Sequence, residues 1–435
     1  MTVLFLQFFI AFLLIGLSST QAFAVGSGAY RIEVPDAGAM GMGSAFVGDA
    51  SSPAAVYYNP AGMTQIVKSS VSIGASLIQP KMDHTSTTGA KTKEDRDSFV
   101  IPNLFYVTHL GMEKVVFGVG ATSSWGLGTE WAGDSFARYS STKTLLQDKD
   151  YLITAAYKMS EQVSLALGVV IDDSSIEKQR KLDQALFGGS GDANAKLKGT
   201  DTAPGFLISG MYKLNDQHQF GLTYRSAIHH KYTGKLHLDN LDTAAANFAF
   251  GSDFASSSYE TNISSKSTIP QALALGYSYK PTEKLKINAD IEWTDWSSTK
   301  HEAVNYTSET NTGKLTFLNL GNPANRDWHS AWALSLGGEY KVDDRLRLRS
   351  GYFYHQSPIP EATWDTCLPD ANSHSIAAGF GYDITKALTF DLAYSAMFFD
   401  AHSIKNNSDA NHPGSLDGKY EQWVNLVLAT ATYSF

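Results

Sequence analysis

Apolar and polar side chains alternate with a period of two residues along much of this 435-residue chain. In residues 387–398 every even position is apolar or aromatic, whereas the odd positions include Thr, Asp and Ser. Residues 284–293 and 345–354 repeat the pattern, with Lys, Arg, Asp or Glu on the polar side. Because successive side chains of a β-strand point to opposite faces, these stretches predict strands with one apolar and one polar face.

Fourteen stretches of this kind follow one another, and short turns alternate with long polar connections between them. Short turns such as residues 111–113 join stretches at one end, and the long connections join them at the other. An even strand number with this arrangement is typical of a bacterial outer-membrane barrel, and twelve or sixteen strands are the alternative counts. The predicted strands lie at residues 68–80, 98–109, 114–124, 150–159, 162–173, 199–213, 217–230, 268–280, 284–298, 328–341, 344–356, 373–383, 387–399 and 420–435.

Charges at every second position are difficult to place in a soluble β-sandwich. An exposed sheet face could carry them in one strand, but their recurrence favours a barrel whose interior holds water. We therefore predict an all-β fold, a 14-stranded antiparallel transmembrane β-barrel in the bacterial outer membrane. Aromatic residues near predicted strand ends fit the girdles at the two membrane surfaces. These residues are Tyr157, Tyr212, Tyr279, Trp293, Trp328, Tyr340 and Trp423.

The first 24 residues differ from the rest because residues 3–17 are almost wholly apolar. Residues 22–24, Ala-Phe-Ala, then fit the small-x-small pattern that signal peptidase reads. The apolar run is short for a membrane helix, which needs about 20 residues. We predict that residues 1–24 are a signal peptide. A membrane anchor is the alternative, because no Lys or Arg precedes the run.

Residues 25–66 do not alternate and are rich in Gly, Ala and Met. Apolar side chains such as Met40, Phe46 and Val56 favour burial over a solvated tail. We predict that this segment is a compact hatch that plugs the lumen of a barrel formed by residues 67–435. A flexible periplasmic tail is the alternative.

The composition excludes several function classes. The net charge is −9 and no basic cluster is present, which argues against nucleic acid as a partner. Cys367 is the single cysteine, so no internal disulfide can form. His229, His230 and His237 form the one histidine cluster, without clear convergence with metal-ligating residues. No nucleophile elbow or phosphate loop is present, so we expect neither an enzyme nor a metal or other cofactor.

Several motifs suggest a family. Residues 52–63 contain Asn-Pro-Ala at Asn59, Pro60 and Ala61, and residues 348–352 read Leu-Arg-Ser-Gly-Tyr. Further motifs follow at residues 126–131, 137–139, 268–270, 293–297, 357–360 and 368–370. In order and spacing these motifs resemble the FadL family of outer-membrane hydrocarbon transporters over nearly the whole mature chain. One departure is that residues 123–127, Ser-Ser-Trp-Gly-Leu, lack the Pro of the family's Pro-Phe-Gly-Leu element.

The resemblance implies a hatch-plugged barrel whose third strand is kinked, leaving a hole in the wall beside the hatch. Outer loops would capture a hydrophobic ligand, which passes to a lumen pocket and leaves sideways. Gly118 and Gly120 are candidates for the kink, because a bend costs little where a strand contains glycine. Trp125, Leu127 and Trp131 are the candidate ligand-capture residues of the outer loop.

A fatty acid would also need a cation or hydrogen-bond donors for its carboxylate. Arg349, Lys178 and Arg180 are the candidates. Arg349 could instead pair with lumen acids, and the two loop residues could simply be solvated. The motif at Asn59 is either a rigid turn, because proline fixes its own φ, or a support for the wall opening, or both.

These observations predict a monomeric transporter that takes up hydrophobic small molecules by passive diffusion, surrounded by outer-membrane lipid. Long-chain fatty acids are the first choice of cargo. Aromatic or aliphatic hydrocarbons, as in the toluene-uptake branch of the family, are the alternative. An adhesin or receptor that uses the long outer loops is a third reading.

Overall fold

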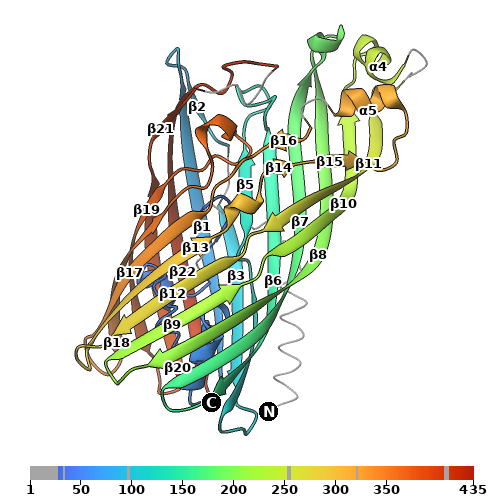
Figure 1. Ribbon diagram of the computed structural model, residues 1–435. Helices are drawn as coiled ribbons and strands as arrows, with labels where there is room; N and C mark the ends of the chain where they lie inside the picture. The colour runs from blue at the N-terminus through green and yellow to red at the C-terminus, as the bar shows by residue number, and fades with distance from the viewer. Residues whose placement is uncertain (1–27, 33–34, 96–97, 252–255, 320–321, 406–410) are drawn as a thin grey trace.

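One antiparallel sheet closes on itself as a barrel of fourteen wall strands, as the alternation predicted. The computed structural model describes residues 28–32, 35–95, 98–251, 256–319, 322–405 and 411–435. The barrel is closed by β1 (Ser70–Ser86), which pairs along its whole length with β22 (Gly418–Ser434). The strands run steeply tilted around the lumen (Figure 1). The predicted signal peptide lies outside the described residues.

Most wall strands run without interruption, and three are divided into two segments. The uninterrupted strands, besides β1 and β22, are β3 (Phe99–Thr108), β6 (Lys143–Lys158), β7 (Val163–Asp183), β8 (Asp192–Lys213), β13 (Leu285–Thr294), β17 (Ala331–Lys341), β18 (Leu346–His355), β19 (Ser373–Asp383) and β20 (Leu388–Phe399). The divided strands are β4 (Val115–Thr122) with β5 (Gly126–Glu130), β9 (His218–Arg225) with β10 (Ile228–Asp239), and β11 (Tyr259–Ile269) with β12 (Ala272–Tyr279).

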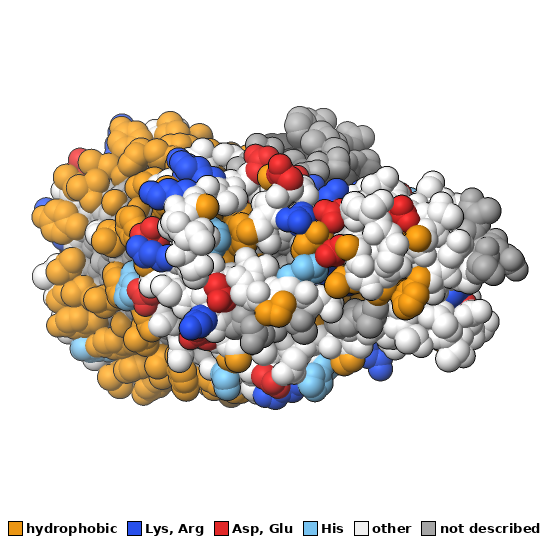
Figure 2. Space-filling view, turned by 90° about the horizontal axis from the view of Figure 1, so that it is seen from above, with side chains coloured by type: hydrophobic (Ala, Val, Ile, Leu, Met, Phe, Trp, Pro, Cys, Tyr) orange, Lys and Arg blue, Asp and Glu red, His pale blue; other side chains and the backbone are white. Residues whose placement is uncertain are grey.

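The outer face of the wall is apolar at membrane level. Along β7, Leu165, Leu167, Val169 and Ile171 are exposed, whereas Ala166 and Val170 between them are buried against the lumen. Figure 2 shows hydrophobic side chains covering the flank of the barrel, with charged side chains on the face seen from above. An outward apolar face and a partly polar interior are the arrangement of a barrel in lipid. Among the described residues, no helix is both long and apolar enough to cross a membrane.

Several strands extend further outward than the alternation predicted. The prediction ended one strand at residue 173, but β7 continues to Asp183 and β8 already begins at Asp192. These extensions rise above the barrel in Figure 1. Two helices from later outer loops, α4 (Thr243–Phe250) and α5 (Thr312–Leu318), lie near the top of the same region. Alternation of apolar and polar residues marks only the part of a strand that has lipid on one face. Beyond the membrane both faces meet water, so a strand can continue there without this alternation.

In their described residues, the remaining outer loops contain short elements only. They are β2 (Lys91–Lys93), η2 (Gln184–Phe187), η3 (Trp296–Ser298), β14 (His301–Glu302), β15 (Val304–Tyr306), β16 (Ala324–Asn325), η4 (Glu361–Thr363) and β21 (His402–Ile404).

The described part of residues 25–66 lies inside the barrel, where the sequence predicted a hatch. It contains α2 (Ala37–Gly41), α3 (Ala55–Tyr58) and η1 (Pro60–Gln65), and nearly all of its side chains up to Met63 are buried. We call this segment the hatch. Its compactness follows from its composition, because small residues let the backbone approach the wall closely.

Polar wall side chains fix the hatch at its centre. Asp290 of β13 accepts hydrogen bonds from the backbone N–H groups of Phe46 and Val47, both at 2.7 Å. Wall glycines provide the necessary space: a Cβ at Gly276 would lie 2.2 Å from a hatch nitrogen, and one at Gly351 would lie 2.1 Å from another. The hatch and the wall are therefore one packed unit.

Candidate functional site

The Asn-Pro-Ala motif ties the hatch together and to the wall. The Asn59 carboxamide oxygen accepts from the Ala61 N–H at 3.1 Å, and its Nδ2 donates to the Val47 carbonyl at 2.9 Å. The same Nδ2 donates to the Gly210 carbonyl of β8 at 3.2 Å. Pro60 begins η1, where its fixed φ suits the first turn. Asn59 thus joins two parts of the hatch to one wall strand.

The third wall strand is interrupted between β4 and β5. The ladder between β3 and β4 runs from Thr108 to Leu104, and β5 pairs with β6 on its other side. Within the described ladders, residues 99–103 of β3 have no partner in β5. Ser123 and Ser124 leave the ladder here. The Ser123 hydroxyl donates to the backbone carbonyl of Asp148, and the Ser124 hydroxyl donates to the carboxylate of Asp150, both in β6. We call this interruption the strand-3 break.

The hatch is hydrogen-bonded to the strand-3 break itself. The Ile32 N–H donates to the Ser124 carbonyl, and the Gly126 N–H donates to the Tyr30 carbonyl, both at 2.7 Å. Arg31 and Trp125 are thereby paired like residues of an antiparallel ladder. The hatch supplies the hydrogen bonds that a continuous third strand would otherwise make with a neighbour.

Gly118 and Gly120 lie below the break, in a regular part of β4. Gly118 is paired with Val107 on one side and Thr154 on the other, so the ladder is continuous there. A Cβ at Gly118 would lie 2.5 Å from side-chain atoms of Met63 and Val56 in the hatch. A Cβ at Gly120 would lie 2.7 Å from the ring of Phe105 in β3 and 3.2 Å from Val56. The interruption follows three residues after Gly120, so these glycines make room for neighbouring side chains rather than mark the break.

The three outer-loop candidates are buried in packed clusters. Trp125 belongs to an aromatic cluster with Tyr30, Trp296 and Trp328, in which neighbouring ring centroids are 4.8 to 6.1 Å apart. Leu127 is buried in the same apolar core. Trp131 packs in a separate outer cluster, and its Nε1 donates to the Thr366 carbonyl at 3.3 Å. Their role in ligand capture remains a prediction.

Arg349 packs against α2 of the hatch and takes part in an ion-pair network. Its Nε lies 2.7 Å from Glu339 and its Nη1 lies 2.5 Å from Asp391. Glu339 also binds Lys286, which reaches Asp49 of the hatch at 2.7 Å. These contacts fit the alternative that Arg349 pairs with acids of the lumen, because carboxylates already bind its guanidinium group. Its role as a ligand site remains a prediction.

Lys178 and Arg180 lie on the outward extension of β7, away from the lumen centre. Lys178 pairs with Glu302, which also binds Arg326 at 2.8 Å. Arg180 is exposed. The structure does not bring either residue to Arg349, so these three candidates do not form one site.

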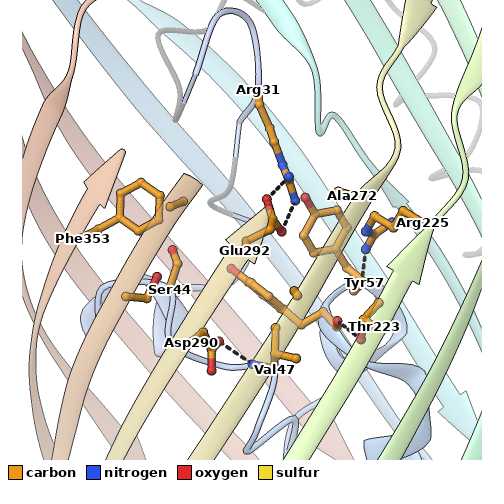
Figure 3. A pocket seen from close by; sticks show the side chains of 14 residues that line it. Arg31, Ser44, Val47, Tyr57, Thr223, Arg225, Ala272, Asp290, Glu292 and Phe353 are labelled. Carbon is orange, nitrogen blue, oxygen red and sulfur yellow. Dashed lines mark hydrogen bonds and ion pairs between the residues drawn. The ribbon is translucent and has the colours of Figure 1, made fainter. Parts of the chain in front are cut away.

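A cavity lies where the hatch faces β9, β12, β13 and β17, and two cations that the sequence analysis missed line it. Arg31 of the hatch binds Glu292 through both carboxylate oxygens, and Arg225 of β9 donates to the Tyr57 carbonyl (Figure 3). The Arg225 guanidinium also stacks on the Tyr57 ring, 4.3 Å from its centroid. The other lining residues are Ser44, Val47, Tyr58, Thr223, Ala272, Ala274, Asp290, Ala333, Ser335 and Phe353.

A second cavity shares Arg31, Tyr57 and Arg225 with the first and continues to the strand-3 break at Ser124 and Trp125. Arg225 makes no ion pair within the part of the chain that the structure describes. The available signal for Arg225 was its place on the polar side of the predicted strand 217–230. Arg31 carried no such signal.

These features define a class of protein: an outer-membrane barrel whose lumen is plugged and whose wall is broken beside the plug. The chain belongs to the family described as "Outer membrane protein transport protein (OMPP1/FadL/TodX)", whose model matches residues 16–435. It is therefore an outer-membrane transport protein.

Relatives of known sequence match over almost their whole length. An outer membrane protein of Neisseria meningitidis serogroup B is 23% identical, over 97% of this chain and 98% of its own. The long-chain fatty acid transport protein of Escherichia coli is 24% identical, over 94% of this chain and 95% of its own.

Solved structures share the fold. A FadL homologue of Pseudomonas aeruginosa superposes with a TM-score of 0.79 at 20% identity, covering 94% of this chain and 100% of its own. The toluene transporter TodX of P. putida superposes with a TM-score of 0.70 at 19% identity, covering 94% of this chain and 99% of its own.

Proposed function

We propose that this protein takes up long-chain fatty acids by passive diffusion, and that the cargo leaves sideways through the strand-3 break. The observation that carries the proposal is the cavity that runs from Arg225 to Ser124 and Trp125, where the hatch is bonded to the interrupted wall. The hatch blocks the axis of the barrel, so a lateral route is the shorter path from this cavity.

The energetics of an acyl chain favour a lateral exit. Moving each CH₂ from apolar surroundings into water costs roughly 0.8 kcal/mol. A chain of about fourteen methylenes would therefore resist release into an aqueous channel by on the order of 10 kcal/mol. Passage through the wall into lipid avoids most of this cost.

Arg225 is the residue proposed to bind the carboxylate. Its guanidinium borders both cavities and contacts the Tyr57 carbonyl and ring rather than an acid. Arg31 is less suited, because Glu292 and Thr294 already bind it. A charge-assisted hydrogen bond from a partly buried guanidinium is a strong and specific contact for a carboxylate.

Aromatic hydrocarbons are the second candidate cargo. The cluster of Tyr30, Trp125, Trp296 and Trp328 stands at the strand-3 break and could bind an aromatic ring edge to face. The similarity to a structure described as a toluene transporter supports the same alternative.

Uptake of labelled oleate and labelled toluene by cells with and without this protein tests the proposal. We expect oleate uptake to depend strongly on the protein and toluene uptake to depend on it less. The reverse order would favour the hydrocarbon alternative, and equal uptake of both compounds in the two strains would refute transport of either.

A further inference from the structure

The wall contains a second interruption, between β8 and the strand formed by β9 and β10. Below it, β8 pairs with β9 from Lys213 to Leu207, and above it β8 pairs with β10 from Thr200 onward. Between these ladders stand residues 201–206 of β8 and residues 226–232 of the neighbouring strand. The second side holds one residue more, so the register shifts across the interruption. We call it the strand-6 gap.

Other hydrogen bonds replace part of the missing ladder at the strand-6 gap. The Ser226 N–H donates to the Phe206 carbonyl, the Phe206 N–H donates to the Ser226 hydroxyl, and the Lys231 N–H donates to the Asp201 carboxylate, each at 2.9 Å. Pro204, between them, has no N–H to satisfy. Unpaired backbone groups at membrane depth are costly unless they are bonded or line a cavity. These hydrogen bonds and Pro204 therefore make a stable interruption rather than a local defect.

The gap lies at the level of the strand-3 break. Thr122, the last residue of β4, is aligned with Asp150 of β6, and Asp150 is aligned with Asp172 of β7. Asp172 is aligned in turn with Ala203, inside the gap. On the outer surface, Phe206 and Ile171 are exposed at this level. The gap therefore opens toward the upper part of the apolar belt.

A single cavity touches both interruptions. It borders Ser124 and Trp125 at the strand-3 break, and Gly205, Phe206 and Ser226 at the strand-6 gap. Because Phe206 is also exposed on the lipid side, the cavity reaches a residue that faces the membrane.

Ile228 and Gly205 pack against each other across the gap. Ile228 is buried and lines the cavity, and a Cβ at Gly205 would lie 2.7 Å from its Cγ1. We infer that the strand-6 gap is a second lateral passage, through which hydrophobic acyl chains or small hydrocarbons move between the lumen cavity and the bilayer, with Ile228 as its gate. This inference rests on the proposed function, because it needs cargo in the cavity.

The passage can be tested with purified full-length protein in phospholipid vesicles and a photoreactive long-chain fatty acid, with labelled residues mapped by mass spectrometry. We expect labels at two places, residues 123–125 and residues 205–228. The Ile228→Ala variant should increase labelling at the second place at least twofold. Leu236→Ala removes the same kind of side chain higher on β10 and should change nothing.

A variant with Ala227 deleted and Pro204→Val should restore the register against β8 and the missing donor, while it shifts the register against β11 by one residue. We expect it to reduce labelling at the second place at least fivefold and to leave residues 123–125 labelled. Label confined to residues 123–125 in the wild type, or unchanged label in Ile228→Ala, would overturn the second passage alone. If no residue of the protein is labelled, both the second passage and the proposed function are overturned. If the deletion variant does not fold, the Ile228→Ala comparison decides.

Discussion

At the scale of single residues, the structure separates cations that hold the barrel together from a cation that faces the cavity. Arg349 is bound by Glu339 and Asp391, whereas the recorded contacts of Arg225 are a backbone carbonyl and an aromatic ring. Both arginines lie on alternating stretches, so sequence pattern alone gives them equal weight. Their difference arises from which residues the closed barrel places opposite them.

Replacing Arg225 tests this distinction. We expect Arg225→Gln to weaken oleate binding about tenfold or more, because a hydrogen bond to a charged group contributes roughly 1.5–3 kcal/mol. Toluene binding should be unchanged, since toluene has no carboxylate. Isothermal titration of purified protein measures both, and Arg225→Lys should retain part of the oleate affinity. Equal loss for the two ligands would show that Arg225 acts through the fold.

A substitution at Gly118 tests how the hatch packs rather than where the wall is interrupted. The Gly118→Ala variant places a methyl group against Met63 and Val56, and overpacking of this kind costs roughly 1–3 kcal/mol. We expect hydrogen exchange of the α3 and η1 amides to accelerate about tenfold. Gly210→Ala is the matched control, because its nearest atom would be 3.5 Å away. Unchanged exchange in Gly118→Ala would mean that the hatch adjusts without loss.

At the scale of elements, the hatch is held at its outer end by a buried acid. The Asp370 carboxylate, in the loop after β18, accepts from the Ala29 N–H at 3.0 Å and from the Ser357 hydroxyl at 2.8 Å. Burial raises the pKa of Asp370 to about 7, although these hydrogen bonds lower it in part. Asp36, which caps α2, is similar: burial raises its pKa to about 6.

The docked hatch should therefore be more stable at pH 5 than at pH 8. A raised pKa means that the docked state binds a proton more tightly than the released state. Docking consequently weakens as the pH rises from about 4 toward about 7. Hydrogen exchange of hatch amides at the two pH values, corrected for intrinsic rates, measures this change. Asp370→Asn should reduce the pH dependence, whereas Asp344→Asn, on an exposed turn, should preserve it.

How far sequence predicts this fold depends on what each element contacts. The alternation located the strands within the membrane, because lipid on one side and the lumen on the other impose a period of two. It failed for the extension of β7 beyond residue 173, where water lies on both faces. The strand-3 break was expected in the correct strand but at Gly118 and Gly120. Its position at Ser123 depends on contacts with Asp148 and with the hatch, which are distant in sequence.

At the scale of the whole molecule, the hatch and the interrupted wall act together in transport. The hatch occupies the lumen axis, and its Tyr30 and Ile32 backbone groups are bonded to the third strand beside the break. Because β5, among the described strands, pairs only with β6 and not with β3, a local release of these bonds can open the wall without unfolding the sheet. The account therefore requires the hatch to separate from the break during transport.

A reversible tether between hatch and break tests that requirement most directly. Arg31 and Trp125 are paired as in an antiparallel ladder, so Arg31→Cys with Trp125→Cys, in a Cys367→Ser background, places two thiols within disulfide reach. We predict that oxidation lowers oleate uptake at least tenfold relative to the reduced form of the same protein, and that reductant restores it. Equal uptake by the oxidised and reduced forms would contradict a lateral exit that depends on release of the hatch.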